Sequence, residues 1–401
     1  MTNQTPSANT SAPADKPLCI VMGCDTFYPD INGAARFAER LAAGLVARGH
    51  DVHIVAPSKT HRKTGTFTEN IEGADMTVHR WASWRWYPHD WLRFVLPWTA
   101  KARARKVLDA VKPDVVHFQS HIVIGRGLAL EATKRNIRIV GTNHVMAENI
   151  LDFATIPESW KDWFVRTSWK TASKVFRTAS SVTTPTRKAA DFLEYHSGLR
   201  GVIPVSCGID ATHYTADLEP RASNKVLFVG RLTTEKQIDV LLHAMTKLPA
   251  DLNASLDIVG GGDQDHNLKT LSHKLGLDDR VRFHGRVSED ELLTFYTDAS
   301  VWAMPSIAEL QSIATMEAMA SGLPVVCANA MALPHLVHDG ENGYLFEPSD
   351  ADDLAEKLLL VLGATPERYL AMQQESLEGV KVHDINRTIE TFERLYRGQT
   401  P

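Results

Sequence analysis

The sequence lacks any long apolar segment. In its 401 residues no hydrophobic run approaches the roughly 18 residues that a membrane-spanning helix needs, so we expect no such helix. Residues 1–17 are polar and rich in Pro, Ser and Thr, without the apolar core of a signal peptide. We therefore expect residues 1–17 to form a disordered tail and the protein to remain in the cytoplasm.

Cysteine is scarce. The four cysteines are Cys19, Cys24, Cys207 and Cys327, and no two of them form a CxxC pair. Cys19, Cys207 and Cys327 lie in or beside apolar runs that are typical of strands, where a buried thiol is the ordinary outcome. The sequence therefore predicts neither disulfides nor a zinc cluster.

The net charge of −5 is small but unevenly distributed. Residues 1–200 carry a net charge of +9, and residues 201–401 carry −14. This asymmetry indicates that the N-terminal half meets an anionic partner such as a phosphate or a membrane surface. Alternatively, the two halves complement each other's charge. No nucleic-acid-binding motif accompanies the basic half, so we expect no nucleic-acid partner.

Strand-like and helix-like segments alternate twice along the chain. The first series begins with a strand at 18–27 and a helix at 33–50, and the second begins after residues 202–210. This alternation predicts parallel sheets with helices on both faces. We expect two doubly wound Rossmann-like α/β domains, 18–202 and 203–378, which face each other across a cleft. Residues 379–401 are predicted to form a helix that returns to the N-terminal domain.

Residues 305–326, PSIAELQSIATMEAMASGLPVV, contain two acids eight positions apart. A helix is predicted from about Ser312 to Ser321, with Gly322 as its left-handed stop, so Glu309 precedes the helix and Glu317 lies inside it. Unpaired amides at a helix start attract an anion, and carboxylates accept hydrogen bonds from sugar hydroxyls. The arrangement fits a nucleotide sugar. Alternatively, Glu309 merely caps the helix and Glu317 is exposed.

Two cations follow a predicted strand at residues 227–239, LFVGRLTTEKQID. Arg231 and Lys236 lie between this strand and the next helix. Cations at the carboxyl end of a strand can neutralise a diphosphate leaving group. Taken alone, the segment could equally be a solvated loop.

Several segments together resemble the retaining glycosyltransferases of family 4, which have the GT-B fold. In the second half these are VGRLTTEKQIDVLLHAM, IVGGGDQD, VRFHGRVSEDELLTFYTDAS and the 305–326 segment. In the first half, YPDINGAARFAERLAAGLVARGHDVHIVAP, PDVVHFQSH and GTNHVMAEN also resemble the family. The resemblance covers about residues 18 to 397.

The resemblance implies a role for each matching residue. Glu309 would bind donor-sugar hydroxyls, Glu317 the ribose, and Arg231 with Lys236 the diphosphate. His144 would lie near the reacting carbon, whereas His117 and His121 are not assigned to the site. The remaining donor contacts would come from Gly33 at the diphosphate, Arg286 at the base, and the backbone of Leu310, Gln311, Ser312 and Ile313.

The resemblance also implies the reaction and the donor. A hexose would pass from a nucleotide-diphosphate sugar, UDP-glucose or GDP-mannose, to a hydroxyl with retained configuration. We expect no required cofactor and no metal, and Asp263-x-Asp265 is not interpreted as a metal site. The chain departs from the family pattern at Gln237, where glycine is usual, and at Leu310-Gln311-Ser312. The latter resembles members that act on lipids, such as diacylglycerol glucosyltransferases or lipid mannosyltransferases.

Tryptophan and basic residues gather in two parts of the N-terminal half. Trp81, Trp84, Trp86, Trp91 and Trp98 fall within 81–98, and Trp160, Trp163 and Trp169 within 160–169, each group among lysines and arginines. Such a mixture suits a membrane interface with anionic lipid. It predicts a peripheral enzyme on the inner face of the cell membrane with a lipid or glycolipid acceptor. The alternative is that these rings pack the core.

Other functions remain open at this point. A soluble acceptor would fit the same motifs. A sugar-nucleotide epimerase shares the two-domain architecture, and a non-catalytic sugar-binding protein could keep the same binding residues.

Overall fold

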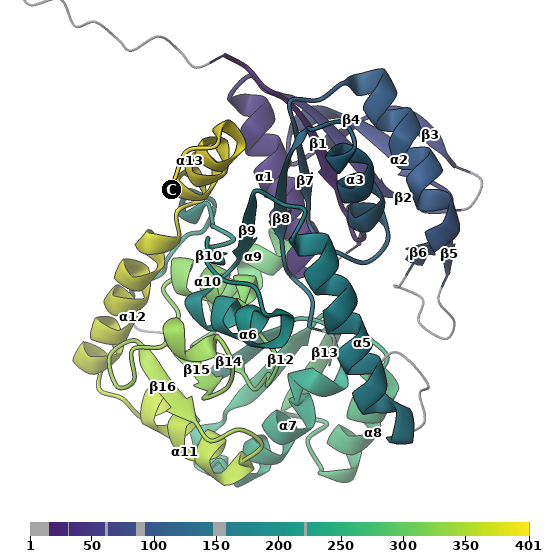
Figure 1. The fold of residues 1–401 in the computed structure, drawn as a ribbon. Coiled ribbons are helices and arrows are strands. Elements are labelled where there is room, and N and C mark those ends of the chain that lie inside the picture. Colours follow the sequence, from purple (N-terminus) through teal and green to yellow (C-terminus); the bar gives the residue numbers. More distant parts are fainter. Residues whose placement is uncertain are drawn as a thin grey trace, which may run out of the picture.

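The computed structural model describes residues 16–30, 32–60, 63–85, 93–146, 158–219 and 223–400. The predicted tail, residues 1–17, therefore lies almost entirely outside the described residues, as do Trp86 and Trp91. The chain forms two doubly wound α/β domains, each built on a largely parallel sheet (Figure 1). This confirms the predicted fold class.

The N-terminal domain contains an eight-stranded sheet in the order β10-β9-β8-β7-β1-β2-β4-β3. Its strands are β1 (Cys19–Gly23), β2 (Asp51–Pro57), β3 (Gly65–Ile71), β4 (Ala74–Trp81), β7 (Val115–Phe118), β8 (Arg138–Thr142), β9 (Ser181–Thr184) and β10 (Ile203–Pro204). Neighbouring strands are parallel, except that β3 and β4 form an antiparallel hairpin at the sheet edge. A separate two-stranded ribbon pairs β5 (Ser83–Arg85) with β6 (Arg93–Val95).

Helices cover both faces of this sheet because successive strand residues point to opposite sides. Ile20 and Met22 belong to the core beneath α1 (Gly33–Ala47) and α13 (Ile385–Arg397). Val21 belongs to the core beneath four other helices. These are α2 (Pro97–Val111), α3 (Ile124–Thr133), α5 (Glu158–Phe176) and α6 (Arg187–Ser197).

The C-terminal domain contains a six-stranded parallel sheet in the order β13-β12-β11-β14-β15-β16. Its strands are β11 (Lys225–Val229), β12 (Ser255–Val259), β13 (Val281–Gly285), β14 (Val301–Met304), β15 (Val325–Ala328) and β16 (Gly343–Phe346). Its helices are α7 (Ile238–Lys247), α8 (Asp265–Lys274), α9 (Glu289–Asp298), α10 (Ile313–Ala320), α11 (Ala351–Leu362) and α12 (Pro366–Val380). No helix within the described ranges is both long and apolar enough to cross a bilayer.

The order of these strands places two distant loops side by side. β11 and β14 are neighbours in the sheet although about 70 residues separate them in the chain. Parallel neighbours end at the same edge, so the loops that follow β11 and β14 meet there. Those loops contain Arg231, Lys236 and Glu309.

The last helix, α13, packs on α1 of the N-terminal domain, and Figure 1 shows the two helices side by side. The rings of Phe392 and Phe37 are 5.7 Å apart between centroids. The Tyr396 hydroxyl lies 2.7 Å from Nδ1 of buried His117. These contacts close the chain onto its first domain, whereas the domain boundaries at 202 and 378 stay a prediction.

Truncating Phe392 to alanine should destabilise the protein by about 3–5 kcal/mol, because the ring is fully buried between α1 and the sheet and its loss leaves a cavity. The free energy of unfolding in urea measures this change. Val382→Ala is the control, since Val382 is 63% exposed and should change stability by less than about 0.5 kcal/mol. Equal effects of the two substitutions would contradict this account of α13.

Candidate functional site

Helix α10 begins shortly after β14, at the edge of the C-terminal sheet where parallel β11 and β14 both end. Ser312 is its N-cap, and the Ser312 hydroxyl accepts a hydrogen bond from the Thr315 amide at 3.3 Å. Gly322 has a φ of +72° just after the helix. Both ends agree with the prediction, and the interpretation of Glu309 as a cap is wrong. The amides of the first turn have no intrahelical acceptor, so this end carries partial positive charge.

Two residues distant in the chain hold this helix start, one in the N-terminal domain and one in the segment just after β10. The Thr186 hydroxyl donates to the Leu310 carbonyl at 3.0 Å, and the Cys207 amide donates to the Gln311 side chain at 2.7 Å. Gly33 lies opposite Ile313, since a Cβ on Gly33 would be 3.9 Å from the Ile313 side chain. The predicted backbone segment 310–313 therefore lies beside the predicted glycine loop.

Lys236 and Glu309 form an ion pair at this edge of the sheet. Their side chains are only 14% and 12% exposed, so water screens the pair weakly. The loop around Glu309 is fixed by its backbone, because the Ile307 amide donates to the Glu235 carbonyl and the Ala332 amide to the Glu309 carbonyl. Lys236 and Glu309, which were both predicted to bind the nucleotide sugar, therefore lie side by side.

Glu235 holds Arg231 beside the same loop. The sequence had given no role to Glu235. Arg231 Nη2 lies 3.4 Å from Glu235 Oε1, and that oxygen also accepts a hydrogen bond from the Thr233 hydroxyl at 2.7 Å. Glu235 thus orients Arg231. The motif itself could have indicated Glu235, since this residue directly precedes Lys236 in the GRLTTEK segment.

The residue after Lys236 shows why the family pattern favours glycine there. Gln237 has a φ of +47°, in the left-handed region that glycine adopts most easily. Its side chain is held by Ser349, to which Gln237 Nε2 donates at 2.8 Å. This bond helps Gln237 occupy the position.

Glu317 is buried, so the interpretation of Glu317 as an exposed helical residue is wrong. Its Oε1 accepts a hydrogen bond from Arg40 Nη2 at 2.9 Å, and its Oε2 accepts one from the Tyr296 hydroxyl at 3.0 Å. Arg40 also lies 3.3 Å from the Tyr214 hydroxyl. Because Arg40 is on α1, this cluster crosses from one domain to the other. Nothing in the sequence indicated that Arg40 would meet Glu317.

His144 lies behind α1 in the N-terminal domain. Its Nε2 donates to the Gln119 side-chain oxygen at 3.0 Å, and its ring centroid is 4.9 Å from that of Phe37. Burial lowers the pKa of His144 to about 3, so the ring is neutral near pH 7 and its Nδ1 is an acceptor. Both of these contacts lie within the N-terminal domain, so among the described residues His144 is not joined by a hydrogen bond to Lys236 or Glu309.

The other histidines of this region are buried. His117 bonds Tyr396 and Thr142, each at 2.7 Å, and burial followed by the nearby His144 lowers its pKa to about 3. His121 packs against Phe176, and burial lowers its pKa to about 4. His117 thus has a structural role in the core.

Arg286 is exposed just after β13 and faces the first loop of the N-terminal domain. Burial raises the pKa of Asp30 in that loop, and the positive charges of Arg80, Arg93 and Arg286 oppose the rise. Among the described residues, two groups have side chains close enough to share a metal ion, Cys19/Asp51/His53 and His338/Glu341/Glu375. Neither group contains a predicted donor residue.

Two family models match the chain. Residues 31–213 match Glycosyltransferase Family 4, and residues 215–376 match Glycosyl transferases group 1. A sulfoquinovosyl transferase of Arabidopsis thaliana is 28% identical over 267 residues, which cover 63% of this chain and 50% of that protein. The chain thus spans about half the length of that relative.

Solved structures share the fold. The sucrose-phosphate synthase from Thermosynechococcus elongatus aligns with a TM-score of 0.79 and 20% identity, over 95% of this chain and 98% of the other. The Anabaena protein HepE, solved with UDP-glucose, aligns with a TM-score of 0.73 and 17% identity, over 94% and 99%. These likenesses agree with the expected GT-B arrangement of two facing domains.

Replacing Arg40 with methionine should cost about 3–5 kcal/mol of stability, because it leaves the buried Glu317 carboxylate without its cation. The double variant Arg40→Met, Glu317→Gln should recover most of that loss, since no buried charge then remains unpaired. Urea unfolding of both single variants and the double variant gives the coupling energy. Additive losses in the double variant would show that the ion pair is not the contact that matters.

Proposed function

The chain belongs to the glycosyltransferases that these two family models describe, and on that premise we propose that it moves a hexose from a nucleotide-diphosphate sugar to a hydroxyl acceptor with retained configuration. The donor would be UDP-glucose or GDP-mannose. No cofactor or metal enters the proposal.

The observation that supports this proposal most strongly is the set of groups around the start of α10. Lys236 and Arg231 follow β11, Glu309 follows β14, and the positive end of α10 lies between them and Gly33. A diphosphate needs cations and amides, and a hexose needs carboxylate acceptors. Groups of both kinds lie at this one edge of the C-terminal sheet.

A bound nucleotide sugar would supply new partners to both members of the ion pair between Lys236 and Glu309. A diphosphate oxygen would give the Lys236 ammonium a new anion, and sugar hydroxyls would give the Glu309 carboxylate new donors. Both charges then stay satisfied although the pair separates, so the buried charges carry little desolvation penalty on binding.

The other residues complete the proposed donor site. Glu317, fixed by Arg40 and Tyr296, would accept the ribose hydroxyls with its remaining lone pairs. Arg286 lies at the end of β13, where the base would lie. Neutral His144 would hydrogen-bond a hydroxyl near the reacting carbon, with Nδ1 as the acceptor.

In the proposed reaction the bond between the anomeric carbon and the diphosphate oxygen breaks while the acceptor oxygen bonds the same face of that carbon. The acceptor proton passes to the leaving phosphate, so no covalent enzyme intermediate is needed. The protein contributes positioning and stabilisation of the developing phosphate charge by Arg231, Lys236 and the α10 amides.

Glu309→Gln should lower kcat by at least about a hundredfold, which corresponds to roughly 2.7 kcal/mol of transition-state stabilisation, because the amide loses the charge that faces the sugar. Binding of UDP or GDP should change little, since nucleotide contacts come from other residues. Transfer from UDP-glucose and GDP-mannose and thermal shifts with UDP and GDP provide the two readouts. Glu341→Gln, at a side chain that is 70% exposed, is the control.

Full turnover by the Glu309→Gln variant would contradict the proposed role of Glu309.

The same thermal-shift panel tests the donor site itself, because a ligand at about 100 times its Kd stabilises a protein by roughly 2.7 kcal/mol. The variant with both Arg231→Ala and Lys236→Ala should lose most of the shift. No shift with UDP, GDP or ADP in the wild-type protein would overturn the proposed function.

For the acceptor we favour a membrane lipid or glycolipid, with the enzyme peripheral at the inner face of the cell membrane. Trp160, Trp163, Arg166, Lys170 and Lys174 are all exposed on α5. Their spacing of three or four residues places them in one stripe along the helix. Trp side chains above a row of cations suit an anionic bilayer surface.

Not every tryptophan of the two groups supports this surface. Trp81 and Trp169 are 5% and 3% exposed and belong to the core, so their predicted membrane contact is wrong. Trp98, on α2, is 76% exposed. The proposed membrane surface rests on the α5 stripe, because there the exposed tryptophans and the cations share one helix.

The variant with Lys170→Ala and Lys174→Ala should bind anionic vesicles about 30-fold more weakly at low salt, because each juxtamembrane cation contributes about 1 kcal/mol. Co-sedimentation with phosphatidylserine vesicles measures the change. Lys274→Ala with Lys381→Ala, two lysines of the acidic half, is the matched control. Absence of vesicle binding by the wild-type protein would remove the membrane from the proposal.

A further inference from the structure

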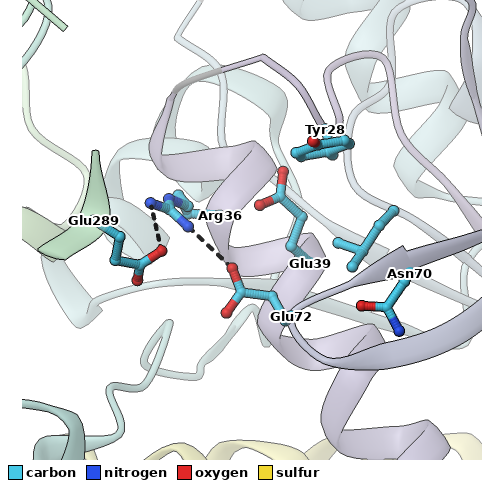
Figure 2. Close-up of a pocket in the computed structure, with 7 residues that line it drawn as sticks. Tyr28, Arg36, Glu39, Asn70, Glu72 and Glu289 are labelled. Carbon is cyan, nitrogen blue, oxygen red and sulfur yellow. Dashed lines mark hydrogen bonds and ion pairs between the residues drawn. The ribbon is translucent and has the colours of Figure 1, made fainter. Parts of the chain in front are cut away.

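A cavity of about 220 Å³ lies beside α1, apart from the residues assigned to the donor. Tyr28 lies in the loop before α1, and Arg36 and Glu39 are on α1 itself (Figure 2). The rest of the lining comes from the end of β3, the turn that follows it and the first residue of α9. Those residues are Asn70, Ile71, Glu72 and Glu289.

Glu39 is the unusual member of this lining. Glu39 is only 3% exposed, yet its Oε1 atom has no hydrogen-bond partner among the described residues. Figure 2 shows the carboxyl group pointing toward the Tyr28 ring. A buried carboxyl group without a partner is costly to folding, which suggests a role in binding.

The charges around Glu39 restrict the ligand. Arg36 lies 3.0 Å from Glu72 and 3.8 Å from Glu289, so the one cation of the lining is engaged by two acids. The cavity is therefore acidic and disfavours phosphate. A divalent metal is also disfavoured, because Glu39, Glu72 and Glu289 are not among the described groups whose ligand atoms converge.

The protonation of Glu39 favours a hydroxyl ligand over a cation. Burial raises the pKa of Glu39 to about 7, the negative charges of Glu72 and Asp30 add to the rise, and Arg36 and Arg40 oppose it. Near neutral pH the group is partly a carboxylic acid, which can both donate and accept a hydrogen bond. A hydroxyl group offers the matching donor and acceptor.

Size and the aromatic wall point to a single ring. A cavity of about 220 Å³ has room for a single sugar-sized ring. Tyr28 is 42% exposed, and Lys59 lies 4.7 Å from the centre of its ring. The Tyr28 ring lines the cavity as its aromatic wall, and Asn70, whose amide donates to Asp75 at 2.7 Å, belongs to the same lining.

We propose that this cavity binds one hydroxyl-rich six-membered ring, a sugar or a cyclitol, with Glu39 hydrogen-bonding its hydroxyls beneath Tyr28. The site goes beyond the donor site described above, because no residue is shared between them. The ring could arrive free in solution or as the head group of a glycolipid.

The test uses the full-length protein and saturation-transfer NMR with myo-inositol, D-glucose and D-mannose, and with ethanolamine as a cation probe. Wild-type protein should bind at least one of the rings and not ethanolamine. Glu39→Leu should weaken ring binding at least tenfold while raising the melting temperature at pH 8, because a buried unpaired carboxylate is removed. Tyr28→Ala, at an exposed side chain, should also weaken it at least tenfold.

Glu356→Gln, at an exposed side chain of α11, serves as the control and should bind like the wild type. Co-sedimentation with vesicles of glucosyl diacylglycerol in phosphatidylcholine distinguishes the two sources: a Glu39-dependent signal assigns the ring to a lipid head group, and its absence with free-ring binding assigns a soluble ring. UDP and GDP thermal shifts, measured on the same variants, keep a failure of this inference apart from a failure of the donor site.

Three results would overturn the inference. Wild-type protein that binds none of the three rings would do so, as would ring binding that Glu39→Leu and Tyr28→Ala leave unchanged. Binding of ethanolamine in place of the rings would assign the cavity to a cation instead.

Discussion

The start of helix α10 is fixed by the N-terminal domain and by the segment after β10, and the candidate donor site depends on this constraint. Thr186 bonds the Leu310 carbonyl, and Cys207 bonds the Gln311 side chain. Each contact joins residues more than 100 positions apart in the chain. The first amides of α10 thereby lie beside the N-terminal domain, and the loops after β11 and β14 bring Lys236 and Glu309 to the same sheet edge.

Buried ion pairs are the second feature of the candidate site. Lys236 with Glu309, and Arg40 with Glu317, are ion pairs in which both side chains are less than 15% exposed. Such pairs contribute little net stability when intact, but each is costly to break by removing one partner. The proposed function explains both pairs as groups kept charged and oriented for a ligand. Glu39 shows the converse, a buried acid whose partner is not supplied by the protein.

Much of this architecture could be predicted from the sequence, because local patterns determine it. The strand–helix alternation, the start and end of α10 and the left-handed Gly322 follow from periodicity and capping. Most side-chain contacts between distant segments could not be predicted, although the family resemblance did bring Lys236 and Glu309 to one site. Arg40 carried no signal of its partner, and the β3–β4 hairpin was missed although its residues 65–81 alternate weakly. Spacing along α5 could have separated exposed Trp160 and Trp163 from buried Trp169.

The central claim is that a nucleotide diphosphate binds at the start of α10 between the two domains. A crystal structure of the protein with bound UDP or GDP tests it most directly. We predict diphosphate oxygens within hydrogen-bond distance of Lys236, Arg231 and the first amides of α10, with the Lys236–Glu309 pair separated. A nucleotide bound elsewhere, with that pair intact, would contradict the account.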